Sequence, residues 1–528
     1  MDQGADRTVV PTRKVFAEGL EGVATQTMTR QGVKVKARTQ ITAKYLLGHR
    51  DGRHHLLRDA SVVFEGDTVV YVGREFDGTV DKHLDLGESV ILPGLIDLDA
   101  LCDIDHVILD SWTGPETSSG LQWSEDYFRT RRHDVFTADE RAQVREYALV
   151  QLALHGVTTF MPISSETHSE WAESYDDAVS IAENASSLGL RGFVGPAFRS
   201  GVNVVREDGA QDVLFDEAEG ERGFEDARRF LDWVQSRRDP LLTGVLLPCR
   251  IETMTRSLLE AVAILANDRG VTVRLHALQG LFEREFIVGR HDMNPLELIK
   301  EVGLLGPMTL IPHALLTDRD PLVHGEDRGD LELLANAGVT VIHCPLTSLR
   351  YGSVLHSFGS YRKAGVNLAL GTDSFPPDLV RGIDVGVHLA KVVDGRLDAA
   401  PAEWYVDAAT LGGARALSRG DLGRIDVGAK ADLVAFSLND IRDGVIDDPI
   451  RTLLLNGTSR QVTHSFVGGR AVVVDGCIPG VDLEALRCRA QHLFEKMKAA
   501  YSERDHQNRS ADELFPATYP SFSSESAS

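Results

Sequence analysis

The segment Val366-Asn-Leu-Ala-Leu-Gly-Thr-Asp373 is a short apolar run followed by a carboxylate. Short apolar runs of this kind recur along the chain, and their number and spacing predict the fold. They alternate with helical stretches through the middle of the chain, which is typical of β/α units with parallel strands. Eight such units predict an α/β fold, namely a closed (β/α)8 TIM-like barrel. The eight runs lie at 90–96, 156–160, 191–195, 244–247, 271–275, 308–311, 339–342 and 366–370.

Two further β-rich blocks flank these units, and the first contains a hairpin signal around Glu65-Gly-Asp67. Because both blocks consist of short β-rich runs separated by turn residues, we expect them to form one small β-sandwich beside the barrel. The terminal segments are polar and lack periodicity, so they are predicted to be mobile. In order, the predicted parts are an arm (1–33), the first sandwich part (34–92), the barrel (93–421), the second sandwich part (422–480), an amphipathic helix (481–508) and a tail (509–528).

The bulk composition favours small-molecule chemistry. A chain of 528 residues is too long for one ordinary core, and a net charge of -24 repels nucleic acid and anionic membranes. Five scattered cysteines indicate neither a disulfide framework nor a zinc ribbon. No apolar run reaches about 18 residues and no signal-like segment opens the chain, so a cytoplasmic location is expected. A homo-oligomer is expected, because the 481–508 helix can pack on its own domain or on a sister subunit.

Polar side chains follow several of the predicted strands. His276, His313 and Asp373 follow strands five, six and eight, and Asp99 lies at the end of the first strand. A lone histidine in such a place is more often a core or rim residue. Nitrogen and carboxylate groups from several strands that converge at one barrel mouth are typical of a divalent metal site. His343, which ends strand seven, fits a structural role better.

Several motifs, in their order along the chain, resemble one family. Ile91-Leu-Pro-Gly-Leu-Ile-Asp97 resembles the entry to the first barrel strand of the amidohydrolase superfamily. His343-Cys-Pro-Leu-Thr-Ser-Leu-Arg-Tyr-Gly352, followed by 364–373, is similar to the branch that contains triazine hydrolases and aromatic aminohydrolases. The segments 409–417 and 423–433 resemble that family's closing helix and its return to the sandwich.

The resemblance implies roles for individual residues. His276 would be the strand-five metal ligand, Asp373 the strand-eight ligand, and His313 would bind the metal or hold the water. The first strand departs from the family, which usually has His-x-His where this chain has Asp99-Ala-Leu101. A carboxylate at position 99 can bind a metal, whereas a leucine cannot.

The strand-five motif departs as well, because Gln279 stands where the family has a carboxylate three residues after the histidine. An amide cannot shuttle a proton to a ring nitrogen, so ring deamination is less favoured. The leading prediction is a hydrolase with one divalent ion, most simply Zn²⁺, with Fe, Mn and Co as alternatives. The ion would lower the pKa of water from about 15.7 to about 7, and Asp373 or His313 would take its proton.

The predicted substrate is a small molecule with a non-peptide C–N bond in an amide, carbamate, urea or ring substituent. Two alternatives stay open at this stage. One is a heteroaromatic amine deaminase in which another acid replaces the missing carboxylate. The other is a catalytically silent, metal-free relative of the family.

The segment Asp97-Leu-Asp-Ala-Leu-Cys-Asp-Ile-Asp-His106 holds four aspartates and a histidine. Strand alternation puts positions 99, 101, 103 and 105 on one face, so Asp103 is a candidate ligand substitute or substrate-binding residue. For Asp105 we favour a solvated, helix-capping acidic loop. His106 is a candidate pocket residue, and a surface position fits it equally well.

Two arginines are candidates for binding a substrate carboxylate through bidentate contacts. Arg199 follows the third strand and Arg350 lies in the loop after the seventh. Ordinary salt bridges are the alternative for both. Four aromatic residues after the first strand are either a lid over the pocket or local core: Trp112, Trp123, Tyr127 and Phe128.

Overall fold

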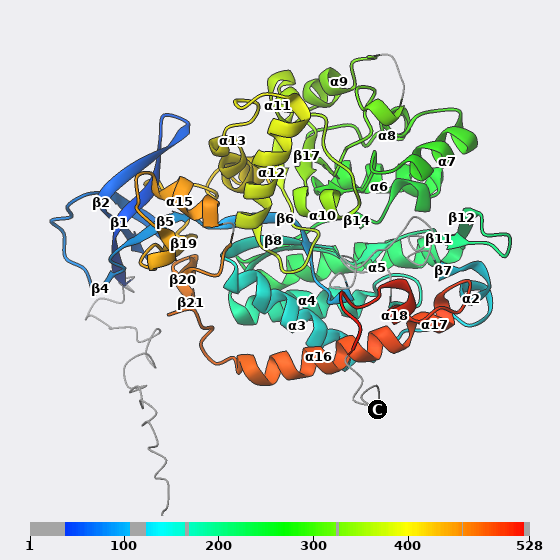
Figure 1. The fold of residues 1–528 in the computed structure, drawn as a ribbon, viewed down its shortest axis with the longest axis horizontal. Helices are drawn as coiled ribbons and strands as arrows, with labels where there is room; N and C mark the ends of the chain where they lie inside the picture. The colour runs from blue at the N-terminus through cyan, green and yellow to red at the C-terminus, as the bar shows by residue number, and fades with distance from the viewer. Residues whose placement is uncertain (1–36, 106–122, 164–167, 324–326, 457, 522–528) are drawn as a thin grey trace, which may run out of the picture.

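Two four-stranded parallel sheets form the centre of the protein in the computed structural model, which describes residues 37–105, 123–163, 168–323, 327–456 and 458–521 (Figure 1). The first sheet has the order β13-β9-β8-β6 and the second has the order β15-β16-β17-β18. Their strands are β6 (Leu95–Leu101), β8 (Val157–Ile163), β9 (Arg191–Val194), β13 (Leu242–Gly244), β15 (Val273–Arg274), β16 (Thr309–Pro312), β17 (Thr340–His343) and β18 (Asn367–Leu370).

Individual backbone contacts link strands of the two sheets. On one side the fourth strand is split between β13 and β14 (Leu247–Pro248), and single parallel bridges join Leu246 to Val273 and Arg250 to His276. On the other side, the backbone N–H of Asp373 donates to the carbonyl of Asp99 over 2.7 Å. The carboxyl ends of all these strands therefore lie at one end of a TIM-barrel-like α/β fold.

Helices follow the strands and cover the two sheets. Their ends carry ordinary signals: Thr137 and Glu140 form a capping box at the start of α3, and Gly189 ends α4 with a φ of 88°. The bounds are α3 (Ala138–Leu154), α4 (Tyr175–Leu188), α5 (Glu217–Arg237), α6 (Arg256–Arg269), α7 (Leu281–His291), α8 (Pro295–Glu301), α9 (Asp330–Ala337), α10 (Pro345–Arg350), α11 (Phe358–Ala364), α12 (Leu379–Asp394), α13 (Ala402–Asp407), α14 (Gly413–Ala416) and α15 (Pro449–Asn456).

Both flanking blocks contribute to one eight-stranded sheet, in which the N-terminal and C-terminal strands lie side by side (Figure 1). The main path is β21-β20-β19-β5-β1-β2-β3, and β4 pairs with β1. The sequence interpretation proposed a sandwich of both flanks; the described residues form this shared sheet. Its strands are β1 (Arg38–Arg50), β2 (Arg53–Glu65), β3 (Thr68–Gly73), β4 (Lys82–Asp85), β5 (Ser89–Pro93), β19 (Leu433–Ser437), β20 (Val462–Val467) and β21 (Arg470–Val473).

Gly94 joins the flanking sheet to the barrel strands, because β5 ends at Pro93 and β6 begins at Leu95. A Cβ atom at position 94 would lie 2.1 Å from the hydroxyl oxygen of Thr158 on β8. Only glycine lets the chain pass this close to the neighbouring strand. The first strand thus enters the barrel directly from the flanking sheet.

The C-terminal segment packs back onto the barrel end. α16 (Leu483–Ala499) lies along α3, and α17 (Tyr501–Arg504) and α18 (Ala511–Leu514) follow it (Figure 1). The sequence interpretation expected a mobile tail from residue 509, yet the side chain of Leu514 is fully buried. Residues 1–36 and 522–528 lie outside the described part of the chain.

A second hydrophobic core lies under this segment, separate from the main one. It joins the C-terminal helices to β7 (Trp123–Ser124), α2 (Glu125–Thr130) and β11 (Gly201–Val205), which itself pairs with β12 (Gln211–Phe215). Within the described residues, no helix combines the length and the apolar character needed to cross a bilayer. The core contains Ile104, Trp123, Tyr127, Phe128, Phe136, Trp171, Leu493, Met497, Tyr501, Leu514 and Phe515.

Candidate active site

Three buried side chains converge where the barrel strands end. Each of Asp99, His276 and His313 offers one ligand atom, and these three atoms all lie within 4.8 Å of one another. The carboxylate Oδ2 of Asp99 lies 3.4 Å from Nε2 of His276 and 4.0 Å from Nε2 of His313. Side chains far apart in the sequence therefore meet at one point.

The two imidazoles are suited to binding a metal. Nδ1 of His276 lies 3.1 Å from the carbonyl of Cys249, a contact that orients the ring and leaves Nε2 facing Asp99. In the described part of the chain, neither Nε2 atom has a hydrogen-bond partner although both are buried. Buried polar atoms without partners are costly unless a ligand satisfies them. The donor set of two nitrogens and one carboxylate fits a divalent ion such as Zn²⁺.

Strained backbone surrounds this cluster. Leu278, His313, Ala314 and Asp373 are not glycines, yet their φ angles are 60°, 65°, 46° and 39°. A non-glycine residue in this region costs of the order of 1–3 kcal/mol, and such residues concentrate at functional sites. The strain at His313 and Asp373 coincides with the turns that follow β16 and β18.

Asp373 lies beside the three converging groups. Its Oδ2 is 3.6 Å from Nε2 of His313, and Thr347 donates a hydrogen bond to its carbonyl. Burial, together with the nearby negative charge of Asp99, raises the pKa of the Asp373 carboxyl well above its usual range. A carboxyl group with a raised pKa is suited to accept and return a proton.

The charges of the cluster favour an ionised Asp99 and a neutral His313. Burial raises the pKa of Asp99, but His276 and Arg274 outweigh burial and lower that pKa below its usual range. Burial lowers the pKa of His313 to about 3, and His276 adds to this effect. Ionised aspartate and neutral histidine are the forms that bind metals.

The structure adds three residues that the sequence interpretation did not single out. Nη1 of Arg274 lies 3.2 Å from Oδ1 of Asp99, and the thiol of Cys344 lies 3.7 Å from Oδ2 of the same carboxylate. The carboxylate of Asp97 accepts hydrogen bonds from the backbone and the hydroxyl of Thr372, which ties the first strand to the eighth. Strand alternation could have indicated Arg274, because it lies two residues before His276 and so on the same face.

The side chain of Gln279 is paired with an arginine. Its Oε1 accepts a hydrogen bond of 2.5 Å from Nη1 of Arg250. The buried carboxyl of Glu283 accepts the backbone N–H groups of Leu278 and Gln279 over 2.6 and 2.9 Å. Burial, with Glu252 nearby, raises the pKa of Glu283 to about 8. An acid is therefore present close to position 279 in space, although it is not at position 279.

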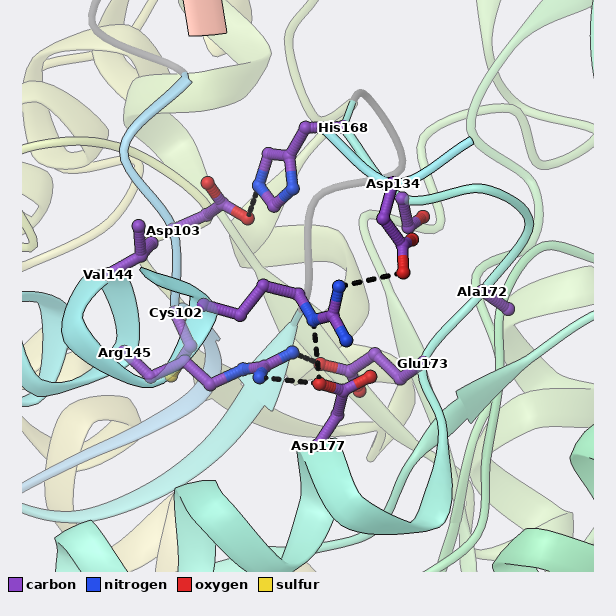
Figure 2. Close-up of a pocket in the computed structure, with 11 residues that line it drawn as sticks. Cys102, Asp103, Asp134, Val144, Arg145, His168, Ala172, Glu173 and Asp177 are labelled. Atoms are coloured by element: carbon purple, nitrogen blue, oxygen red, sulfur yellow. Dashed lines mark hydrogen bonds and ion pairs between the residues drawn. The ribbon is translucent and has the colours of Figure 1, made fainter. Parts of the chain in front are cut away.

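Asp103 lines a charged pocket whose lining contains none of the three converging residues (Figure 2). Its Oδ2 lies 2.5 Å from Nε2 of His168, and both side chains are buried. Arg145 in the same pocket pairs with Glu173 and Asp177 over 3.3 and 2.8 Å. Asp103 is thus an ion-pair partner of a histidine and is not one of the three converging groups.

Asp105 is buried, which differs from the solvated loop expected for it. His106 and Trp112 lie outside the described residues. Trp123, Tyr127 and Phe128 are buried in the second core, so they fit the local-core alternative better than a lid.

The two arginines considered for a substrate carboxylate contact the protein itself. Arg199 is fully buried, and its Nε donates to the carbonyl of Trp171 over 2.7 Å. Arg350 donates to the hydroxyl of Ser374 and to the carbonyl of Phe375, which holds the loop after β18. These contacts explain both side chains as structural, so neither enters the functional proposal. His343 packs against Phe358 and Tyr405.

Curated relatives match most of this chain. A 5-methylthioadenosine/S-adenosylhomocysteine deaminase from Halobacterium salinarum is 28% identical over 451 residues, covering 84% of this chain and 95% of the relative. An 8-oxoguanine deaminase from Pseudomonas aeruginosa is 25% identical over 414 residues, covering 77% of this chain and 87% of the relative.

Solved structures share the fold. A zinc-bound adenosine deaminase from Xanthomonas campestris has a TM-score of 0.70 at 22% identity, covering 87% of this chain and 98% of the other. A zinc-bound atrazine chlorohydrolase from Arthrobacter aurescens has a TM-score of 0.70 at 20% identity, covering 86% of this chain and all of the other.

The model of the amidohydrolase family matches residues 90–472, which is well over half of the chain. This match confirms the resemblance carried by the motifs around Asp97, His343 and Asp373. It also covers every residue of the converging cluster. The chain therefore belongs to the amidohydrolase family, as a hydrolase that acts on carbon–nitrogen bonds other than peptide bonds.

Proposed function

We propose that this protein hydrolyses a non-peptide C–N bond of a small molecule with water activated on one divalent metal ion, and that the eight strands form a closed barrel around that site. Asp99, His276 and His313 would hold the ion. The observation that carries the proposal is the convergence of three buried ligand atoms, of which the two imidazole Nε2 atoms lack a hydrogen-bond partner within the described residues. When bound, a divalent ion supplies hydroxide at neutral pH by lowering the pKa of its water to about 7.

Asp373 carries the proton in this proposal. Its Oδ2 lies 3.6 Å from Nε2 of His313, the nitrogen that would bind the ion. It takes the proton from the attacking water and returns it to the leaving amine nitrogen. The raised pKa, caused by burial and by Asp99, supports this assignment. A carboxylate with a raised pKa is a stronger base, so it takes the proton from water more readily and holds it until the departing amine accepts it. No covalent intermediate is required.

Amides, carbamates, ureas and ring substituents all fit this chemistry. The amide at position 279 argues against direct ring protonation from that position, because a glutamine side chain has no group that gains or loses a proton near neutral pH. The hydrogen bond from Arg250 keeps the oxygen of Gln279 engaged. Gln279 would therefore orient a substrate group rather than move a proton.

A second candidate function is deamination of a heteroaromatic amine. The names of the relatives favour it, since deaminases match this chain over most of both lengths. The acid that this reaction needs would have to come from outside position 279, and Glu283 is the nearest in sequence that is buried. Release of ammonia from a heteroaromatic amine would distinguish this candidate, because hydrolysis of an amide or a urea leaves a ring amine intact.

The metal proposal is tested by the metal content of purified protein. We expect one divalent ion per chain in the wild type, and loss of the ion together with activity in His276→Ala and His313→Ala. His343→Phe is a matched control, because His343 is equally buried at the end of β17 but packs on Phe358 and Tyr405. It should keep the ion. Retention of the metal by His276→Ala would remove the basis of the proposal.

The bond that is cleaved is tested by a substrate panel. It would contain 5-methylthioadenosine, S-adenosylhomocysteine and 8-oxoguanine as amines, beside N-acyl, carbamate and urea compounds. Ammonia released from the amines at a rate that His313→Ala abolishes would favour deamination. Carboxylate or carbamate products without ammonia from a ring amine would favour the leading proposal.

A further inference from the structure

A buried guanidinium lies against the carboxylate of the candidate metal site. Arg274 is on β15, two residues before His276, and its side chain is 3% exposed. Its Nη1 lies 3.2 Å from Oδ1 of Asp99, whose side chain is fully buried. The same nitrogen donates to the carbonyls of Leu98 and Met161 over 3.4 and 3.3 Å. The guanidinium, carried by β15, is therefore held by contacts with two neighbouring strands, β6 and β8.

The two oxygens of Asp99 face different partners. Oδ1 faces the guanidinium of Arg274, whereas Oδ2 faces Nε2 of His276 and Nε2 of His313. The carboxylate is thus shared between a fixed cation and the position where the imidazoles converge. Without the guanidinium, the buried negative charge of Asp99 would lose the cation that contacts its Oδ1, which is costly in a protein interior.

We propose that Arg274 is a built-in counter-cation that weakens the affinity of this site for divalent metal while it stabilises the site without metal. This inference rests on the proposed function, because it assumes that Asp99, His276 and His313 bind the ion. A fixed positive charge beside one carboxylate oxygen repels a second cation at the other oxygen, and this repulsion is strong where water is excluded. The arginine therefore sets how tightly the ion is held.

Orientation of Asp99 does not depend on Arg274 alone. The thiol of Cys344 lies 3.7 Å from Oδ2, and the backbone N–H of Asp99 donates to Asp97 over 3.2 Å. Asp99 also lies within β6, where its carbonyl accepts the N–H of Asp373. Removal of the guanidinium should thus change the charge at the site more than the placement of the carboxylate.

The test is the dissociation constant for Zn²⁺ of the full chain, measured by competition with a chromophoric chelator after metal removal. Arg274→Met keeps the length of the side chain and removes the charge, so it should bind Zn²⁺ at least about tenfold more tightly than the wild type. Arg274→Lys keeps a positive charge and should stay within about threefold of the wild type. The metal-free Arg274→Met protein should melt at a lower temperature, and Zn²⁺ should raise its melting temperature by more than it raises that of the wild type.

Arg191→Met is the matched control, because Arg191 is also 3% exposed and pairs with a buried carboxylate, Asp432, over 2.9 Å. It should lower the melting temperature without changing the affinity for Zn²⁺. Unchanged or weaker Zn²⁺ binding by a folded Arg274→Met protein would overturn the inference and leave the proposed function intact. If Arg274→Met does not fold, Arg274→Gln takes its place with the same expectation. If neither the wild type nor the variants bind Zn²⁺, the proposed metal site fails and the inference fails with it.

Discussion

At the scale of single residues, position 99 defines the site. Asp99 is the first-strand group that reaches the two imidazoles, whereas Leu101, two residues later on the same strand, carries no ligand atom. The site therefore depends on one carboxylate from β6. The groups that contact this carboxylate consequently influence the whole site. Arg274, Cys344 and the backbone of Asp373 all contact Asp99.

Substitution of Asp373 should impair proton transfer without impairing metal binding. Asp373→Asn keeps the size of the side chain and an oxygen donor but removes the proton acceptor, so we expect the metal content to stay near that of the wild type. Loss of one general acid–base group typically lowers kcat by about 10²–10⁴-fold. Metal analysis and turnover on the same preparation provide the measurement. Loss of the ion from this variant would make Asp373 a ligand instead.

At the scale of elements, the end of β6 is joined to the segment before α4 through a buried ion pair. Asp103 follows β6 and His168 precedes α4, and the pair lies beside the network of Arg145, Glu173 and Asp177 (Figure 2). Burial alone would lower the pKa of His168, but Asp103 outweighs it and raises that pKa above 6.5. Burial raises and His168 lowers the pKa of Asp103, with a net shift below 3.8.

These shifts predict a pH dependence of stability. The raised pKa of His168 contributes stability that is present below pH 6.5 and is lost as the pH rises through its folded-state pKa. The lowered pKa of Asp103 contributes stability that is present above pH 3.8 and is lost as the pH falls through its folded-state pKa. The pair therefore stabilises the fold most between these limits.

The measurement is the melting temperature of wild type and His168→Gln between pH 5 and pH 9. Because glutamine does not titrate, the difference between the two proteins should be largest at the acidic end and shrink toward alkaline pH. His388→Gln is the control, since His388 also pairs with an aspartate, over 3.2 Å, but its side chain is 61% exposed. It should follow the wild type at every pH. A constant difference between wild type and His168→Gln would contradict the assignment.

At the scale of the whole molecule, the C-terminal segment forms part of the barrel end. It lies beyond residue 472, where the family match stops, yet Tyr501, Leu514 and Phe515 complete a core that also contains Ile104 and Trp123. Those two residues flank 106–122, the segment that follows the first barrel strand. The C-terminal helices thus pack against residues on both sides of that segment, Ile104 before it and Trp123 after it.

This arrangement predicts that the tail contributes to stability. Leu514→Ala should destabilise the protein by about 2–5 kcal/mol, because it removes a fully buried leucine side chain from a packed core. Ile441→Ala, at a position that is 94% exposed, should change stability by less than about 0.5 kcal/mol. Thermal unfolding of both variants beside the wild type makes the comparison. Equal melting temperatures for Leu514→Ala and the wild type would mean that the tail is as mobile as its composition predicted.

The local pattern of residues was sufficient for much of this protein. Apolar runs that recur between helical stretches predicted the parallel strands, because burial on both faces of a strand requires continuous apolar residues. Polar residues after those runs predicted Asp99, His276, His313 and Asp373 as one group, because parallel strands all end on the same side. Motifs in the expected order along the chain indicated the amidohydrolase family, and the family match confirms that resemblance.

Other features depended on the three-dimensional arrangement of distant segments. The guanidinium of Arg274 meets Asp99, which is 175 positions earlier in the chain. Strand alternation puts Arg274 on the same face as His276, but nothing local in either segment indicates that its partner is Asp99. Asp103 turned toward His168, and Leu514 became core in spite of its polar surroundings in the sequence. Periodicity reports which face of an element is buried; the partner across that face is chosen by packing and charge pairing between elements, which only the folded chain brings together.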